Sequence, residues 1–164
     1  MRAIQAVLVA LAATVTLTSV AGAMPAAAKQ RVAIDMKIYP QKTFVLTPLQ
    51  AGPLKRDSGT IDSTWLSVPG RKVMRDGQEV TIYNGAVTTL TGKRGTLTIR
   101  DRNEWVDLGR DWNGDGESDA IAFGTWTVVR GTGQYAGIVG KGRSAHAGLG
   151  SPWYARFEGF LNSP

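Results

Sequence analysis

Short stretches in which apolar and polar residues alternate fill most of the chain, and turns that contain glycine separate them. The clearest case is the pair of residues 71–75 and 78–83, which Asp76-Gly77 joins. Asp-Gly provides the two left-handed positions of a type I′ turn, and this turn sets Val73 opposite Val80. The pattern therefore predicts a β-hairpin.

The alternation continues toward the C-terminus, with one interruption. Asn84-Gly85 breaks it, which either a second tight turn or a β-bulge would explain. A turn at residues 92–95 precedes Leu97 and Ile99, which alternate with polar neighbours, and residues 123–129 are rich in β-branched and aromatic side chains. These segments predict further strands.

The last predicted strand, residues 153–161, has two distinct faces. One face holds Trp153, Ala155 and Phe157, and the other holds Tyr154, Arg156 and Glu158. No stretch after residue 28 sustains a helical periodicity, and the turns recur at spacings of roughly ten residues, which indicates an all-β fold. We prefer a single closed antiparallel barrel to a sandwich of two sheets.

The first 28 residues follow a different pattern. Arg2 is their only charged residue, an apolar centre spans residues 6–20, and small-residue patterns end at Ala23 and Ala28. A basic start, an apolar centre and an A-x-A site are typical of a secretory signal peptide. The alternative is a retained membrane anchor, because the uncharged run is long enough to span a bilayer.

We therefore predict a signal peptide at residues 1–28, cleaved after Ala23 or Ala28. Residues 29–41 would follow as a flexible lead-in, because Pro40 interrupts any strand there. Residues 42–164 would form the barrel domain. The mature protein would be secreted or extracytoplasmic, with no integral membrane span after cleavage.

Composition excludes several kinds of site. The chain has no cysteine and one histidine, His146, which argues against disulfide scaffolds and against zinc and haem sites. Residues 131–136 and 140–145 match G-x-G-x-x-A, but the helix and acid that a nucleotide site needs do not follow, so we expect no nucleotide. His146 lies among small residues without a G-x-S-x-G elbow and is expected to be a surface residue.

The net charge is positive but dispersed. Formal charge is +6, with 19 basic and 13 acidic residues, and the basic residues form no run. We interpret this charge as favouring solubility, and we expect no nucleic-acid partner for an exported protein.

An acidic segment gives the sharpest local motif. Its oxygen-bearing residues are Asp111, Asn113, Asp115, Glu117 and Asp119. Alternate oxygen side chains before a glycine, with a later aspartate and the carbonyl of Glu117, can surround a hard cation, so we predict a structural calcium site of low affinity. The EF-hand match is partial because position twelve is Ala122, and a solvated acidic hairpin loop is the alternative.

Aromatic and charged residues supply the other candidates for a site. Most of the tryptophans are expected in the core, and a subset could line a ligand cavity; they are Trp65, Trp105, Trp112, Trp126 and Trp153. Tyr154, Arg156 and Glu158 are candidate catalytic residues only if their face points into the barrel. An outward, exposed ion pair is the alternative for Arg156 and Glu158.

Residues 123–137, FGTWTVVRGTGQYAG, and the following Gly140-Lys141-Gly142 resemble the signature hairpin of the allene oxide cyclase-like and dirigent-like barrel superfamily. The resemblance implies an antiparallel barrel of about eight strands with a mostly apolar interior. Plant members of that superfamily guide cyclisation or radical coupling of small molecules. We find no counterpart of their acidic or asparagine active-site residues, and the acidic 111–119 loop is a departure, so the chain looks closer to exported bacterial barrels of this type.

These observations lead to one functional expectation with two alternatives. We expect an exported barrel that binds a small apolar or amphipathic molecule without catalysis, stabilised by a loop-bound calcium ion. The first alternative is a cyclase or isomerase of the allene oxide cyclase or dirigent type that uses Tyr154, Arg156 and Glu158. The second is a module that interacts with an anionic cell envelope through its positive charge.

Overall fold

The computed structural model describes residues 28–66, 70–83, 85–112, 114, 116, 118–149 and 152–164. The predicted signal peptide lies outside the described residues except for Ala28, and so do three residues of the predicted calcium loop, Asn113, Asp115 and Glu117. Within the described ranges, no helix is long and apolar enough to cross a membrane.

The described residues form ten strands and one short 3-10 helix. Their bounds are β1 Lys29–Tyr39, β2 Thr43–Pro48, β3 Asp57–Trp65, β4 Arg71–Arg75, β5 Gln78–Tyr83, β6 Ala86–Gly92, β7 Gly95–Asp107, β8 Ala120–Gly131, η1 Gly133–Tyr135, β9 Val139–Gly148 and β10 Trp153–Asn162.

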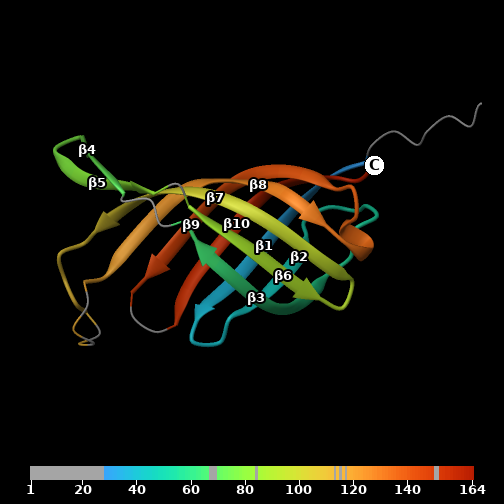
Figure 1. The fold of residues 1–164 in the computed structure, drawn as a ribbon, viewed down its shortest axis with the longest axis horizontal. Helices are drawn as coiled ribbons and strands as arrows, with labels where there is room; N and C mark the ends of the chain where they lie inside the picture. Colours follow the sequence, from blue (N-terminus) through green and yellow to red (C-terminus); the bar gives the residue numbers. More distant parts are fainter. Residues whose placement is uncertain are drawn as a thin grey trace, which may run out of the picture.

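Eight of these strands close into a barrel, and two lie outside it (Figure 1). The barrel order is β7-β6-β3-β2-β1-β10-β9-β8, and β8 pairs with β7 to complete the ring. All of the pairings are antiparallel. Because β8 pairs with β7, the described strands of the ring leave no edge open. The prediction of an all-β closed antiparallel barrel is confirmed.

The two outer strands are the predicted hairpin. In β4 and β5, Val73 pairs with Val80, and Asp76 and Gly77 have φ values of 49° and 82°. This is the expected two-residue turn. Tyr83 of β5 pairs with Asn103 of β7, and the hairpin projects from one end of the barrel, far from η1 (Figure 1).

The break between β5 and β6 behaves as a bulge. Both strands pair with β7 in the same direction, with Tyr83 opposite Asn103 and Val87 opposite Arg100. The β5–β6 side therefore holds one residue more than the β7 side between these two pairs, which is the definition of a bulge. Gly85 in this break has a φ of 87°.

The expected flexible lead-in at residues 29–41 is wrong. Residues 29–39 form β1, which pairs with β2 on one side and with β10 on the other. Val32, Ile34 and Met36 of this strand are buried in the core. Pro40 follows the strand rather than interrupting it, and three apolar side chains at alternate positions provide the burial that holds the strand in place.

Alternation along each strand places the core inside the barrel. In β10, Ala155 and Phe157 are buried while Tyr154 and Arg156 are exposed, so the strand has the two predicted faces and the charged one points outward. Trp126 of β8 is 1% exposed and packs edge-on against Phe157 at 6.4 Å between ring centroids. The interior is thus filled by side chains over much of its length.

Hydrogen bonds to the carboxylate of Asp57 connect η1 to the neighbouring end of the barrel. Asp57 at the start of β3 accepts hydrogen bonds from the backbone N–H groups of Ser58, Lys93 and Arg94. The hydroxyl of buried Tyr135 in η1 donates to the same carboxylate at 3.1 Å. These hydrogen bonds hold η1 across this end of the barrel.

Candidate functional site

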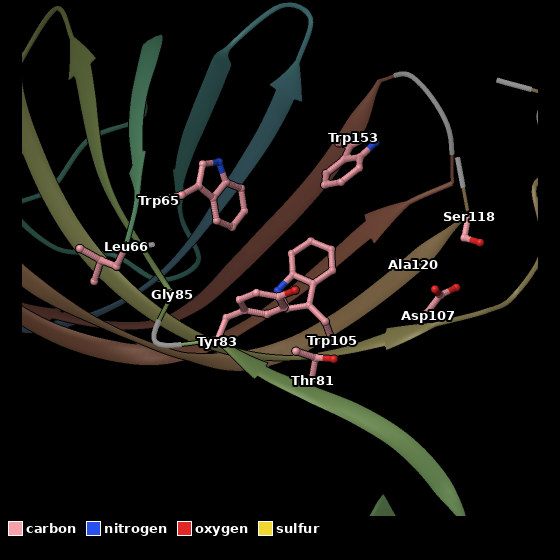
Figure 2. A pocket seen from close by; sticks show the side chains of 10 residues that line it. All are labelled: Trp65, Leu66, Thr81, Tyr83, Gly85, Trp105, Asp107, Ser118, Ala120 and Trp153. Atoms are coloured by element: carbon pink, nitrogen blue, oxygen red, sulfur yellow. The ribbon is translucent and has the colours of Figure 1, made fainter. Parts of the chain in front are cut away.

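A pocket of about 580 Å³ lies at the barrel end opposite η1, beside the β4–β5 hairpin (Figure 2). Its lining residues come from the ends of β3, β5, β7, β8 and β10 and from the adjoining connections. They are Trp65, Leu66, Thr81, Tyr83, Gly85, Trp105, Asp107, Ser118, Ala120 and Trp153. We call this the aromatic pocket, because four of these side chains are aromatic.

Trp105 is the centre of the aromatic pocket. Its ring centroid lies 6.2 Å from that of Trp65, 6.3 Å from Tyr83 and 5.8 Å from Trp153. The antiparallel order explains the gathering, since β3, β5 and β7 finish at this end while β10 begins there. Figure 2 shows Trp65 and Trp153 on separate strands with Trp105 between them.

The structure separates the five tryptophans into three groups. Trp65, Trp105 and Trp153 line the pocket, Trp126 belongs to the core, and Trp112 is 62% exposed in the connection between β7 and β8. The expectation that most of the tryptophans lie in the core is wrong, because only Trp126 of the five does. Three of the others line a pocket, and Trp112 is exposed outside it.

Polar groups occupy one side of the aromatic pocket. Asp107 follows Trp105 by two residues in β7, so both side chains project from the same face of the strand. The Asp107 carboxylate accepts a hydrogen bond from the Gly109 N–H at 2.8 Å. Among the described lining residues, Asp107 is the one charged side chain, so the lining itself carries a negative charge.

His146 lies against Trp105, inside the barrel. The two ring centroids are 5.8 Å apart, and Phe157 packs edge-on against the imidazole at 5.4 Å. The expectation of a surface histidine is wrong, because the His146 side chain is 4% exposed. Residues 144–148 belong to strand β9, and alternation along this strand turns His146 inward.

A buried aspartate faces His146. The Oδ2 atom of Asp101 lies 3.4 Å from Nε2 of His146, and the Asp101 side chain is 5% exposed. Its carboxylate also accepts hydrogen bonds from the Ala86 N–H at 2.6 Å and from Nδ2 of Asn103 at 2.7 Å. The hydroxyl of Ser144 donates to Oδ1 of Asn103 at 3.0 Å, which extends the network across to β9.

The environment of Asp101 favours its ionised form. Burial by itself raises the pKa of this carboxyl, but the contacts with His146, the Ala86 N–H and Asn103 together outweigh burial and bring the pKa below its ordinary value. The barrel therefore holds a carboxylate beside an imidazole, a pairing that can orient the ring or exchange a proton with it.

Several buried polar atoms of this region have no hydrogen-bond partner within the described part of the chain. They include Nδ1 and Nε2 of His146 and the indole Nε1 of Trp105. An indole N–H is a donor only, and leaving a buried donor unpaired costs about 1 to 3 kcal/mol. Such atoms are candidates for contact with a bound molecule.

Tyr154, Arg156 and Glu158 lie on the outer surface of the barrel. Arg156 donates hydrogen bonds to Asp35 and to Glu158, each at 2.8 Å, and Arg31 donates to Glu158 at 3.2 Å. The hydrogen bonds from Arg156 and Arg31 lower the pKa of Glu158. These residues do not face the interior, as a catalytic role would require, and Arg156 and Glu158 instead form a surface ion-pair network with Asp35 and Arg31.

The described part of the 111–119 loop uses its carboxylates for backbone contacts. Asp111 accepts hydrogen bonds from the N–H groups of Gly114 and Gly116, and buried Asp119 accepts from the Trp112 N–H at 2.9 Å. Asn113, Asp115 and Glu117 lie outside the described residues. Among those described, no three histidine or acidic side chains converge on a point that could hold a metal ion.

The comparisons with known proteins give no match. Models of protein families, curated proteins and solved structures were compared with the chain, and none is significantly similar to it. The resemblance of residues 123–142 to the allene oxide cyclase-like and dirigent-like superfamily thus stays a prediction.

Proposed function

We propose that the barrel binds a small amphipathic molecule in the aromatic pocket, as an exported protein and without catalysis. The observation that carries this proposal is the gathering of Trp65, Tyr83, Trp105 and Trp153 around a cavity of about 580 Å³. Pockets of about 300 to 1,000 Å³ with mostly apolar and aromatic linings are typical of small-molecule sites. The polar groups of Thr81, Asp107 and Ser118 would orient the ligand.

The exposure of two of these rings supports the same proposal. Trp65 is 47% exposed and Tyr83 is 37% exposed, although both lie beside a large apolar neighbour. A ligand that covers these rings gains about 25 cal/mol for each Å² of apolar surface removed from water. The core below is packed, so the binding site is the barrel end rather than a continuous lumen.

Naphthol, which has an aromatic body and one hydroxyl group, is a suitable first probe. The five tryptophan indole N–H signals in a proton–nitrogen NMR spectrum report on the site. We expect naphthol to shift the signals of Trp65, Trp105 and Trp153 but not that of Trp126. Unchanged signals at saturating naphthol, together with unchanged signals for other aromatic alcohols, would contradict the proposal.

Two alanine variants separate pocket binding from nonspecific stacking. Trp65→Ala removes a half-exposed pocket ring, and we expect it to weaken naphthol binding about tenfold, which corresponds to about 1.4 kcal/mol. Trp112→Ala is the matched control, because Trp112 is exposed and does not line the pocket. Equal weakening by both variants would count against the site.

A second candidate function is proton-transfer catalysis of the cyclase or isomerase type. The observation that favours it is the buried His146–Asp101 pair, whose ring nitrogens have no hydrogen-bond partner in the described structure. Trp105 touches both His146 and the pocket, so a ligand that moves Trp105 would reach the imidazole. In this candidate function, the catalytic groups are His146 and Asp101 inside the barrel rather than Tyr154, Arg156 and Glu158 on its surface.

The single histidine makes this candidate directly testable. In nitrogen-labelled protein, the two imidazole nitrogen signals belong to His146 alone. Catalysis requires that a ligand bound in the pocket shifts these signals and that proton exchange into the ligand stops in His146→Gln. A ligand that shifts the tryptophan signals but leaves the imidazole signals unchanged supports binding without catalysis.

Export and calcium complete the proposed function. The signal-peptide pattern of residues 1–28 supports export, and the oxygen-rich residues 111–119 support a structural calcium ion that would fix the connection beside the pocket. The resemblance of residues 123–142 to barrels that handle small organic molecules supports the choice of ligand class.

A further inference from the structure

The charge of the aromatic pocket is opposite to that of the whole chain. The chain has a formal charge of +6, yet the described lining contains one carboxylate, Asp107, and neither lysine nor arginine. Asp107 is exposed at the edge of the pocket, so its attraction for a cation is screened by solvent and adds to that of the aromatic rings. The pocket therefore attracts positive charge even though the protein as a whole repels it.

The aromatic rings add attraction of the same sign. The face of an indole or phenol ring carries partial negative charge, and tryptophan binds cations more strongly than the other aromatic residues do. Three indoles and one phenol meet here, with Trp105 as the common neighbour. In Figure 2, Trp65 and Trp153 lie on opposite sides of the view, and Trp105 lies below and between them.

In the described residues, no lysine or arginine of the chain contacts the rings of the aromatic pocket. Within the described residues, the one cation–ring contact is that of Lys29 Nζ over Phe160, at 4.2 Å on the outer surface. Asp107 likewise has no lysine or arginine partner in the described structure, and its hydrogen bond comes from a backbone N–H. The rings of the aromatic pocket and the carboxylate of Asp107 can therefore both contact a cation from a bound molecule.

We propose that the aromatic pocket recognises an organic cation with an alkylated ammonium group, held by the rings of Trp65, Trp105 and Trp153 and by the carboxylate of Asp107. This inference rests on the proposed function and names its ligand class. An alkylated ammonium suits the site because its methyl groups are apolar and its charge is diffuse. A primary ammonium is more strongly hydrated and loses more on entering an apolar cavity.

Choline and its neutral isostere provide a test that isolates charge. In the isostere, a tert-butyl group replaces the trimethylammonium group, so size and hydroxyl are retained. We expect choline to bind at least about five times more tightly, equivalent to about 1 kcal/mol of cation–ring and carboxylate attraction. Affinities are measured from the indole N–H signals at low and high salt.

The variant Asp107→Asn removes the carboxylate and keeps the shape of the side chain. We expect it to reduce the preference for choline by at least half without changing the affinity for the neutral isostere. Asp62→Asn is the control, since Asp62 is an exposed aspartate of β3 outside the pocket lining and the change in net charge is the same. The expected result is an unchanged preference in this control.

The outcomes distinguish this inference from the proposed function. If the isostere and naphthol bind as well as choline does, the cation preference is overturned and the binding function stands. If none of the three binds, the proposed function itself fails. If the two asparagine variants reduce the preference equally, the attraction is a property of overall charge, and the assignment to Asp107 is overturned.

Discussion

The Nε2 atom of His146 lies 3.4 Å from Oδ2 of Asp101, and the two side chains are 4% and 5% exposed. A buried carboxylate is stable only with its hydrogen bonds and its polar neighbours in place. We therefore expect Asp101→Asn to lower the free energy of unfolding by about 2 to 3 kcal/mol, measured by urea denaturation. Arg156→Ala, which removes an exposed ion pair, should cost at most about 1 kcal/mol, and equal losses would contradict this assignment.

Acid should weaken the barrel partly through Asp101. The folded-state pKa of Asp101 lies below the ordinary value of 3.8, so its contribution to stability is present above that pH and is lost as pH falls through the folded value. The difference in unfolding free energy between the wild type and Asp101→Asn should shrink as pH falls below 3.8. A difference that stays constant over this acid range would show that Asp101 does not titrate with unfolding.

The fold was predictable because strand alternation and turn residues are local signals. The hairpin register of Val73 and Val80 and the two faces of β10 follow from a period of two and from Asp-Gly. The strand β1 is harder to predict, because Pro40 lies just beyond it, although Val32, Ile34 and Met36 alternate as buried positions. Here tertiary burial outweighed a nearby strand-breaking residue.

The site was less predictable, because it depends on the register between distant strands. Asp101 and Asn103 continue the alternate positions of Leu97 and Ile99, which indicates that these two polar residues point inward. The partner of Asp101, His146, comes from β9, and local sequence does not show which strands the barrel places opposite one another. The gathering of Trp65, Trp105 and Trp153 depends in the same way on closure of the ring.

Gly85 should tolerate no side chain. A Cβ at this position would overlap the backbone carbonyl of Asp101, and its φ of 87° already disfavours other residues. We expect Gly85→Ala to destabilise the protein by about 3 kcal/mol or more, seen as a lower melting temperature. Gly77→Ala is the control, because Gly77 has a φ of 82° but nothing within 4 Å, and it should cost about 1 kcal/mol. Similar losses would mean that the close approach to Asp101 is unimportant.

The hydrogen bond from the Tyr135 hydroxyl to Asp57 should stabilise the barrel end near η1, and this stabilisation should be lost at alkaline pH. Burial and the adjacent Asp57 carboxylate raise the pKa of Tyr135 above its ordinary value of 10. The stabilisation is therefore complete below pH 10 and is lost as pH rises toward the folded value. Tyr135→Phe should cost about 1 kcal/mol at neutral pH and make unfolding less sensitive to alkali. An alkaline transition identical to that of the wild type would rule out this role.

Calcium should stabilise the wild-type protein through the 111–119 loop. Asp115 is the central acidic ligand of the predicted motif, so Asp115→Ala should have the same melting temperature with calcium as the wild type has with chelator. For an affinity of about 1 mM, calcium at about 10 mM adds roughly 1.4 kcal/mol, a shift of a few degrees. Asp62→Ala is the control and should keep the full shift, because it removes one carboxylate from β3 outside the motif. Identical wild-type melting curves with calcium and with chelator would remove the site, leaving Asp111 and Asp119 as acceptors for the loop backbone.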